Sequence, residues 1–174
     1  MYVSELTELS SIPWFAVQVR ARQEWRLKDA LSNKGYEIFL PTRSGAANTR
    51  HRQPVLFPGY LFCRVDPRLR LPILTTPGVI GFAGTGRIPT AVPEGEIDRI
   101  RMVVSSGFER ESKPLVTAGE RVRVTVGALR GLEGILVQEK SAWRVVIAVT
   151  LLQRSVAVDV DRDWVEPLYM KAVG

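Results

Sequence analysis

The chain has 174 residues, 45% of them hydrophobic, and its 24 lysines and arginines outnumber its 18 aspartates and glutamates, for a formal net charge of +6. This length fits one or two small domains, and the hydrophobic content excludes a largely disordered chain. A single cysteine and a single histidine exclude an intrachain disulfide and leave too few soft ligands for zinc, so we expect no metal and no cofactor. Because no run of about 18 apolar residues occurs and the N-terminus carries acids, we expect a cytoplasmic protein without a membrane segment.

The first predicted elements are a strand over residues 14–20 and a helix over residues 23–34. WFAVQVR is apolar and β-branched, which favours a strand. The next segment repeats apolar residues at helical spacing from Leu27 to Leu31, and Gly35 ends it. We therefore expect a strand that leads directly into a helix.

Arginines gather around this strand and helix. The planar guanidinium group suits phosphates and the edges of guanine bases, so these side chains are candidates for nucleic-acid binding. A solvated face with ion pairs to neighbouring acids is equally compatible with the charge alone. The candidates lie at the end of the strand, along the helix and in a later polar loop: Arg20, Arg22, Arg26 and Arg52.

A strand over residues 36–41 and a long strand over residues 55–65 follow, separated by a polar loop over residues 44–52. The long strand begins at a Pro-Gly bend and carries Tyr60 and Phe62, so both rings point to one face of the sheet. Burial of both rings in a core is the more frequent outcome for such a pair. If the face is exposed, it is a docking site for another molecule.

The stretch after the long strand completes a first domain. Short strands are predicted over residues 78–82 and 88–92, joined by the turn GTGR, and Pro93 starts a last helix with a buried apolar stripe. The turn is too short for a phosphate-binding loop, and no nucleophile, base or metal set converges, so we do not expect an enzyme. The expected fold class is α+β, with three helices on an antiparallel sheet.

The composition changes after a charged stretch over residues 108–117, which is typical of a linker. Five short β-rich runs follow with no helical pattern among them. We expect these runs to close into a small barrel, because closure removes exposed strand edges. A strand enters a turn at Gly127 and the chain leaves it through Gly134, both places where a side chain would obstruct a tight backbone.

The stretch RVRVTVGALRGLEGILV resembles the KOW motif of SH3-like barrels, with Gly127, Leu129 and Gly134 at motif positions. WFAVQVR, LFPGYLF, TPGVIGFAG and IPTAVPEGEIDRI precede it in an order that resembles the NusG family of transcription factors. Within that family the chain looks most like the specialised UpxY, RfaH and LoaP paralogs. The implied domains are an N-terminal NGN domain, a linker and a C-terminal SH3-like KOW β-barrel, over residues 12–107, 108–117 and 118–170.

The resemblance implies a bacterial transcription elongation and antitermination factor that acts by binding alone. In the family, an apolar patch of the N-terminal domain binds the clamp helices of the RNA polymerase β′ subunit. This contact favours the elongating state and suppresses pausing and termination. The positions in this chain that match the patch are Trp14, Tyr60, Phe62 and Phe82.

The resemblance also implies a contact with DNA. In the RfaH-like branch, basic residues of the first strand and helix contact the non-template DNA strand, and Arg20 and Arg26 match those positions. Arg22 and Arg52 are added on charge alone. Binding through these groups should weaken steeply with salt.

Further implied partners are the polymerase β gate loop for the first domain, and a small-subunit ribosomal protein or Rho for the barrel. The chain departs from the family at both places, with RLRLPIL at residues 68–74 in place of hydroxyl residues and Ala128-Leu129 in place of an aromatic residue. We expect a monomer that serves particular, polysaccharide-type operons. The alternatives are a housekeeping NusG-like elongation factor and a ribosome- or RNA-binding KOW protein, which would bind free RNA without polymerase.

Overall fold

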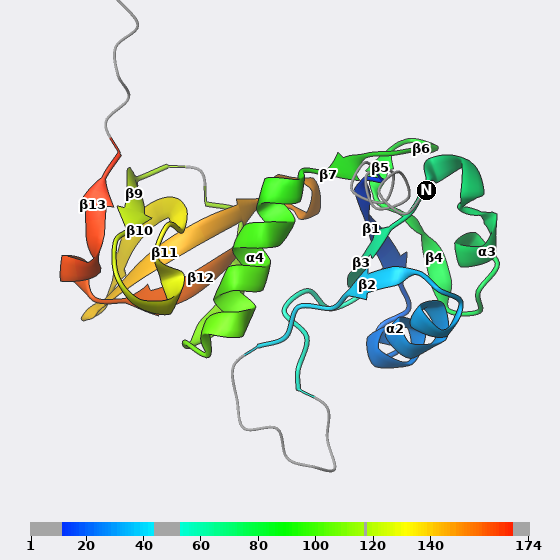
Figure 1. Cartoon of the computed structure of the whole chain (residues 1–174), viewed down its shortest axis with the longest axis horizontal. Coiled ribbons are helices and arrows are strands. Elements are labelled where there is room, and N and C mark those ends of the chain that lie inside the picture. The colour runs from blue at the N-terminus through cyan, green and yellow to red at the C-terminus, as the bar shows by residue number, and fades with distance from the viewer. Residues whose placement is uncertain (1–11, 44–52, 117, 169–174) are drawn as a thin grey trace, which may run out of the picture. The chain divides into compact units, whose positions relative to one another are not determined.

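The computed structural model describes most of the chain, and the chain forms two compact units (Figure 1). The described residues are 12–43, 53–116 and 118–168. The two units consist of the described parts of Met1–Pro41 with Phe57–Ile97, and of Thr42–Leu56 with Asp98–Gly174. The units are therefore interleaved along the sequence.

The first unit is built on an antiparallel sheet with strand order β2-β3-β1-β4, and β7 pairs with β1 as well. Five of the six residues of β1 are buried, which fits its place inside the sheet. A separate two-stranded ribbon joins β5 to β6. The strands are β1 (Trp14–Val19), β2 (Glu37–Phe39), β3 (Tyr60–Arg64), β4 (Val79–Phe82), β5 (Gly84–Thr85), β6 (Ile88–Pro89) and β7 (Ala91–Val92).

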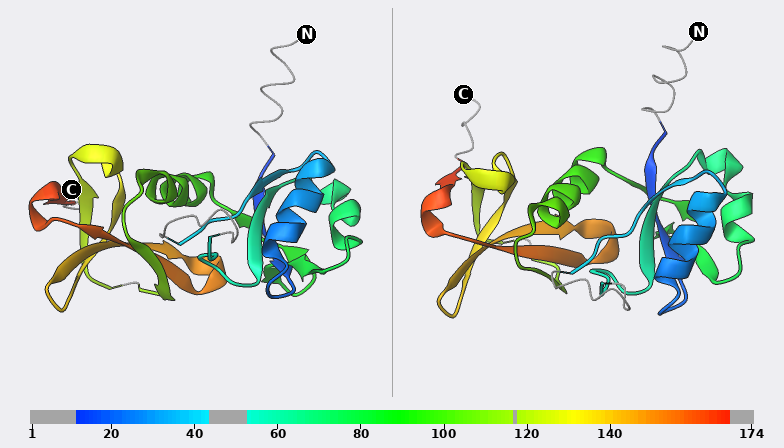
Figure 2. Two further views of the ribbon diagram at one scale, coloured as in Figure 1. Left: turned by 90° about the horizontal axis from the view of Figure 1, so that it is seen from below. Right: turned by 60° about the horizontal axis from the view of Figure 1, so that its bottom comes forward.

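Two α-helices and a 3-10 turn accompany these strands: α2 (Glu24–Asn33), η1 (Pro67–Leu69) and α3 (Leu71–Leu74). The third helix, α4 (Glu94–Ser106), begins in the first unit, and its residues from Asp98 on belong to the second. Helix α2 buries Leu27 and Leu31 completely and packs against β2 and β3 (Figure 2). Both helices predicted with clear apolar stripes, over 23–34 and after Pro93, are confirmed. None of the helices in the described part of the chain is long and apolar enough to cross a membrane.

The strand predicted over residues 55–65 is shorter than expected. Only Tyr60–Arg64 pairs as β3. A turn precedes it, because Gly59 has a φ of +84° and the Tyr60 amide donates to Phe57 O over 3.0 Å. The Pro-Gly bend therefore starts the strand rather than lying within it.

The second unit contains a six-stranded antiparallel sheet with strand order β13-β9-β10-β11-β12-β8. The five β-rich runs predicted beyond residue 118 are confirmed as strands, and their closure into a barrel stays a prediction. Valines of β11 and β12 and Ile147 of β11 supply buried core positions. The strands are β8 (Arg110–Pro114), β9 (Glu120–Val124), β10 (Glu133–Glu139), β11 (Ala142–Val149), β12 (Arg154–Val160) and β13 (Val165–Pro167).

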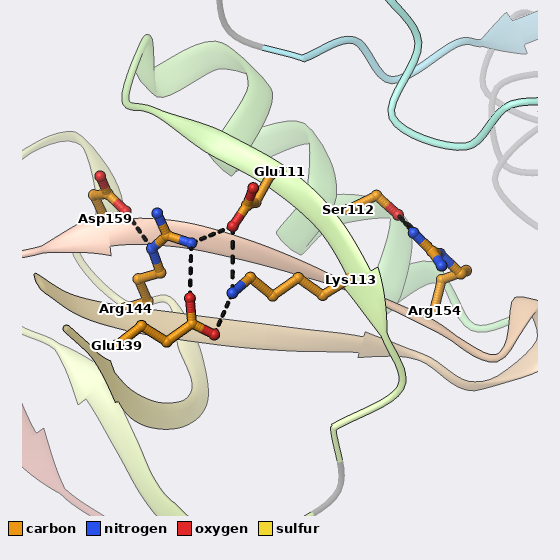
Figure 3. A network of polar contacts seen from close by, with 7 residues as sticks. All are labelled: Glu111, Ser112, Lys113, Glu139, Arg144, Arg154 and Asp159. Atoms are coloured by element: carbon orange, nitrogen blue, oxygen red, sulfur yellow. Dashed lines mark hydrogen bonds and ion pairs between the residues drawn. The ribbon is translucent and has the colours of Figure 1, made fainter.

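Strand β8 lies within the stretch that the sequence predicts as a linker, residues 108–117. Its five residues RESKP pair with β12 along their whole length. The apolar alternation that marks a half-buried strand is missing, because ion pairs and hydrogen bonds from neighbouring strands satisfy its side chains (Figure 3). A prediction based on the alternation of apolar residues therefore does not identify β8 as a strand.

Candidate functional site

The first candidate set consists of four aromatic residues on the sheet of the first unit. The register pairs Trp14 with Arg64, Ala16 with Phe62 and Gln18 with Tyr60. Since paired residues of an antiparallel sheet share a face, Trp14, Tyr60 and Phe62 lie together. We call the face of the sheet that carries Trp14, Gln18, Tyr60, Phe62 and Arg64 the Tyr60 face.

Phe82 lies on the opposite face of the sheet. It pairs with Val17, which alternates with the residues of the Tyr60 face, and its ring meets that of Phe15 edge-on at 5.9 Å. The structure thus brings together three of the four predicted aromatic residues. The fourth, Phe82, packs against Phe15 on the other face of the sheet.

The three rings of the Tyr60 face differ in exposure. Trp14 and Phe62 have no exposed surface, whereas Tyr60 is half-buried. Phe62 packs between Phe39, stacked at 6.1 Å, and Phe57, edge-on at 6.0 Å. Tyr60 is therefore the accessible ring of the three, and Phe62 lies buried beside it on the same face.

Arg64 is a member of this site that the sequence reasoning did not single out. Its guanidinium carbon lies 4.8 Å from the centre of the Trp14 ring, and its Nη2 donates to Glu94 Oε1 over 2.6 Å. Its Nε lies 2.9 Å from Glu37 Oε2, and the Trp14 indole donates to Glu94 Oε1 over 3.2 Å. The signal was available, because Arg64 follows Tyr60 and Phe62 at the same two-residue spacing.

The predicted arginines lie around the start of α2, with one exception. Arg20 and Arg22 are exposed, and Arg22 has a positive φ of 67° in the turn between β1 and α2. Arg26 is also exposed, but its Nη2 donates to Gln23 Oε1 and to Pro77 O, each over 2.8 Å. Arg52 lies outside the described residues.

Gly78 allows the TPG segment, residues 76–78, to pack closely against side chains at the start of α2. Its φ is +103°, and a Cβ atom there would lie 2.9 Å from Arg26 Nη2 and 3.2 Å from Leu27 Cδ1. The Arg20 amide donates to Gly78 O over 2.8 Å. The backbone of this segment thus holds Arg20 and Arg26 in place, and only glycine fits there.

The predicted KOW residues occupy structural positions in the second unit. Gly127 opens a 3-10 turn with a φ of +71°, and Leu129 in that turn is fully buried. A Cβ atom on Gly134 would lie 2.6 Å from Val146 O and 2.7 Å from Val145 Cγ1, so β10 and β11 approach closely there. The three residues shape the turn and the sheet.

The first unit also exposes several apolar side chains. Some of them lie in RLRLPIL, the segment in which the sequence departs from the family. Leu69 and Leu71 are each 66% exposed, and Ile80 on the edge strand β4 is 58% exposed. Single exposed apolar residues are common, but neighbouring ones in RLRLPIL favour an interaction surface.

The one cysteine of the chain, Cys63, lies in β3 with its thiol buried. Burial raises the pKa of the Cys63 thiol to about 12, with a smaller contribution from the charge of Glu37, so the thiol is protonated and unreactive at neutral pH. Among the residues that the structure describes, no group of three or more histidines, cysteines and acids is placed to hold a metal ion. The histidine of the chain, His51, lies outside those residues.

A family model and individual relatives of this chain are all described as NusG. The family model described as transcription termination factor NusG matches residues 13–101. The transcription termination/antitermination protein NusG of Thermus thermophilus is 28% identical over 177 residues, covering 87% of this chain and 96% of its own length. The NusG protein of Deinococcus radiodurans is 25% identical over 183 residues, with the same two coverages.

The fold has a counterpart among solved structures. A structure described as domain interaction in Thermotoga maritima NusG aligns with a TM-score of 0.58 at 21% identity, over 92% of this chain and 99% of that one. At this identity the alignment shows a likeness of fold.

Proposed function

This chain belongs to the NusG family of transcription termination/antitermination factors, and we propose that it is an elongation factor that binds RNA polymerase and suppresses pausing and termination. The observation that carries the proposal is the Tyr60 face, where Trp14, Tyr60 and Phe62 lie together on two central strands of the first unit. The family's polymerase-binding patch matches these positions.

We assign the Tyr60 face to the clamp helices of the polymerase β′ subunit. A half-buried aromatic ring on a central strand, with buried aromatic residues beside it and polar neighbours at its rim, suits a reversible protein contact. Gln18 and Arg64 supply the polar rim on this face. Phe82 enters the proposal through its packing against Phe15 rather than as a contact.

Mechanistically, the factor acts by differential affinity. A protein that binds the elongating state of the polymerase more tightly than the paused state shifts the population toward elongation. No chemical step is required of any residue. The exposed leucines of RLRLPIL, Leu69 and Leu71, are our candidates for a second contact on the polymerase, at the β gate loop.

We assign the exposed arginines to the non-template DNA strand. Arg20 and Arg22 present their guanidinium groups beside the start of α2, and Arg52 is included on charge alone. Arg26 also fastens Pro77, so its substitution has a structural effect in addition to any effect on DNA. Phosphate contacts of this kind weaken as salt rises.

We further propose a specialised role, at polysaccharide-type operons, with the second unit acting as a KOW barrel that recruits a small-subunit ribosomal protein or Rho. The structural roles of the motif residues Gly127, Leu129 and Gly134 support the KOW part of this proposal. A housekeeping elongation factor is the alternative within the family. The two differ in whether a particular DNA element is needed for recruitment.

The decisive experiment is capture of core RNA polymerase by the purified full chain, with polymerase that lacks the clamp helices as the reference. Tyr60→Ala should abolish capture and the suppression of pausing in reconstituted transcription. Tyr36→Ala is the matched control, because Tyr36 is also half-buried but precedes β2 outside the Tyr60 face. Equal capture of both variants would overturn the assignment, and tight binding of free RNA without polymerase would favour the RNA-binding alternative.

A further inference from the structure

Strand β8 is polar, whereas β12, the strand with which it pairs, is apolar. It forms one edge of the six-stranded sheet, and its five residues RESKP contain no apolar side chain before Pro114. Its partner β12 is deeply buried, with residues Ser155–Val158 at most 1% exposed. A polar strand thus closes the edge of an apolar one.

One face of β8 is held by ion pairs. Glu111 contacts Arg144 and lies 3.3 Å from Lys113 Nζ, and Lys113 also pairs with Glu139 (Figure 3). Arg144 Nε lies 2.7 Å from Asp159 Oδ1. We call these five residues, which come from β8, β10, β11 and β12, the charge ladder.

The other face of β8 is held by hydrogen bonds. Arg154 donates to Ser112 Oγ from Nε over 3.0 Å and from Nη2 over 2.8 Å. Arg110 is buried, and its Nε donates to Thr42 O over 2.8 Å and its Nη1 to Phe108 O over 3.1 Å. Beyond the strand, the Val116 amide donates to Ser155 Oγ over 2.9 Å. Polar side-chain contacts therefore fasten both faces of β8.

The charge ladder is open to solvent ions. Its side chains are between 16% and 45% exposed, so dissolved salt screens their attraction. The remaining strands are joined through buried valines, isoleucines and leucines, whose association salt does not weaken. Salt thus weakens the ion pairs of β8, while the buried apolar contacts between the inner strands keep their strength.

We propose that β8 is a releasable strap whose attachment to β12 depends on ionic strength. When it is attached, the chain between α4 and β9 is fixed along the sheet. When it detaches, residues 110–114 leave the sheet and the edge of β12 opens. Two glycines with positive φ, Gly107 at +75° and Gly119 at +142°, flank the strap and supply its hinges.

This device goes beyond the proposed polymerase contact and does not depend on it. A permanent edge strand of this sheet would be expected to bury apolar residues as the inner strands do. An edge strand with polar side chains on both faces has a smaller free-energy difference between its attached and detached states than an apolar inner strand, so we expect its amides to open locally.

The test is amide hydrogen exchange of the full chain at low salt and at about 1 M sodium chloride. We expect the amides of residues 110–114 to exchange at least about tenfold faster at high salt, while those of β10 and β11 keep their rates. Equal salt dependence of β8 and of the inner strands, or none in β8, would overturn the proposal.

Two variants sharpen the test. Glu111→Gln should accelerate exchange in β8 at low salt and flatten its salt response. Glu133→Gln is the control, because Glu133 pairs with Arg123 at 2.5 Å on the same sheet without contacting β8. An equal effect of both substitutions on β8 would contradict a role for the charge ladder.

A cross-link across the register pair Lys113 and Ser155 gives an independent measurement. In Lys113→Cys with Ser155→Cys, a disulfide should make exchange in β8 slow at both salt concentrations, and reduction should make it fast. Cys63 does not compete, because it is buried in the first unit. If exchange in β8 is unchanged by oxidation, the strand does not detach and the proposal fails.

Discussion

Arg64 and Glu94 are joined by a hydrogen bond of 2.6 Å although 30 residues separate them in the sequence. The bond links the end of β3 to the first turn of α4, and the same carboxylate oxygen accepts from the Trp14 indole on β1. Since Arg64 also reaches Glu37 on β2, one guanidinium group connects three strands or helices of the first unit to β3.

Replacing Arg64 should therefore destabilise the first unit. Arg64→Met leaves two carboxylates without their cation and removes the group stacked on Trp14, so we expect a loss of about 1–3 kcal/mol in the free energy of unfolding. Arg123→Met is the control, since the exposed pair of Arg123 with Glu133 should contribute less than about 1 kcal/mol. Urea unfolding measures both, and equal losses would contradict the role given to Arg64.

The two rings of the long strand should separate into a core residue and a contact residue. Phe62→Ala removes a fully buried ring between Phe39 and Phe57 and should cost about 3–5 kcal/mol. Tyr60→Ala should cost about 1 kcal/mol while abolishing polymerase capture. Thermal unfolding compared with polymerase capture tests this, and a Tyr60 variant as unstable as the Phe62 variant would place Tyr60 in the core.

Replacing Gly134 with any larger residue should destabilise the second unit, because β10 and β11 approach closely at this position. Gly134→Ala brings a methyl group to 2.6 Å from Val146 O, so β10 and β11 must move apart, at a cost of about 1–3 kcal/mol. Gly95→Ala is the matched control, because the space at Gly95 in α4 is open and alanine favours a helix. Denaturant midpoints should move in opposite directions for the two variants, and a neutral Gly134→Ala would refute the close approach.

The buried thiol of Cys63 should make stability fall at alkaline pH. Its pKa is raised from 9.0 to about 12 in the folded chain, so the unfolded chain loses the thiol proton first as the pH rises. The stabilising contribution is complete below pH 9.0 and is lost progressively toward pH 12. Unfolding of wild type and Cys63→Ala across this range isolates the effect, since tyrosines and lysines are common to both, and parallel curves would contradict it.

Much of the fold could be predicted from periodicity, because apolar residues mark most of its elements. The runs that became β9 to β13 alternate or cluster valines and isoleucines, and α2 and α4 carry apolar stripes. Strand β8 could not be found this way. Its pairing depends on charges from three other strands, and only the folded sheet brings them together.

The candidate site could be predicted in part. The two-residue spacing of Tyr60 and Phe62 correctly places both rings on one face, but it does not distinguish the exposed ring from the buried one. The side of the sheet on which Phe82 lies depends on the register of β4 against β1, which shifts between Gln18 and Val19. Such a shift has no signature in the sequence of either strand.

The interleaving of the two units decides when each can be completed as the chain is synthesised. The strands of the first unit have all emerged once β7 has appeared, so its sheet can form early. Thr42 belongs to the second unit and pairs locally with Val55, but its carbonyl accepts a hydrogen bond from Arg110, which is synthesised much later. A chain stopped short of that arginine can fold its first sheet, but the connection between β2 and β3 then lacks the side chain that fixes its start.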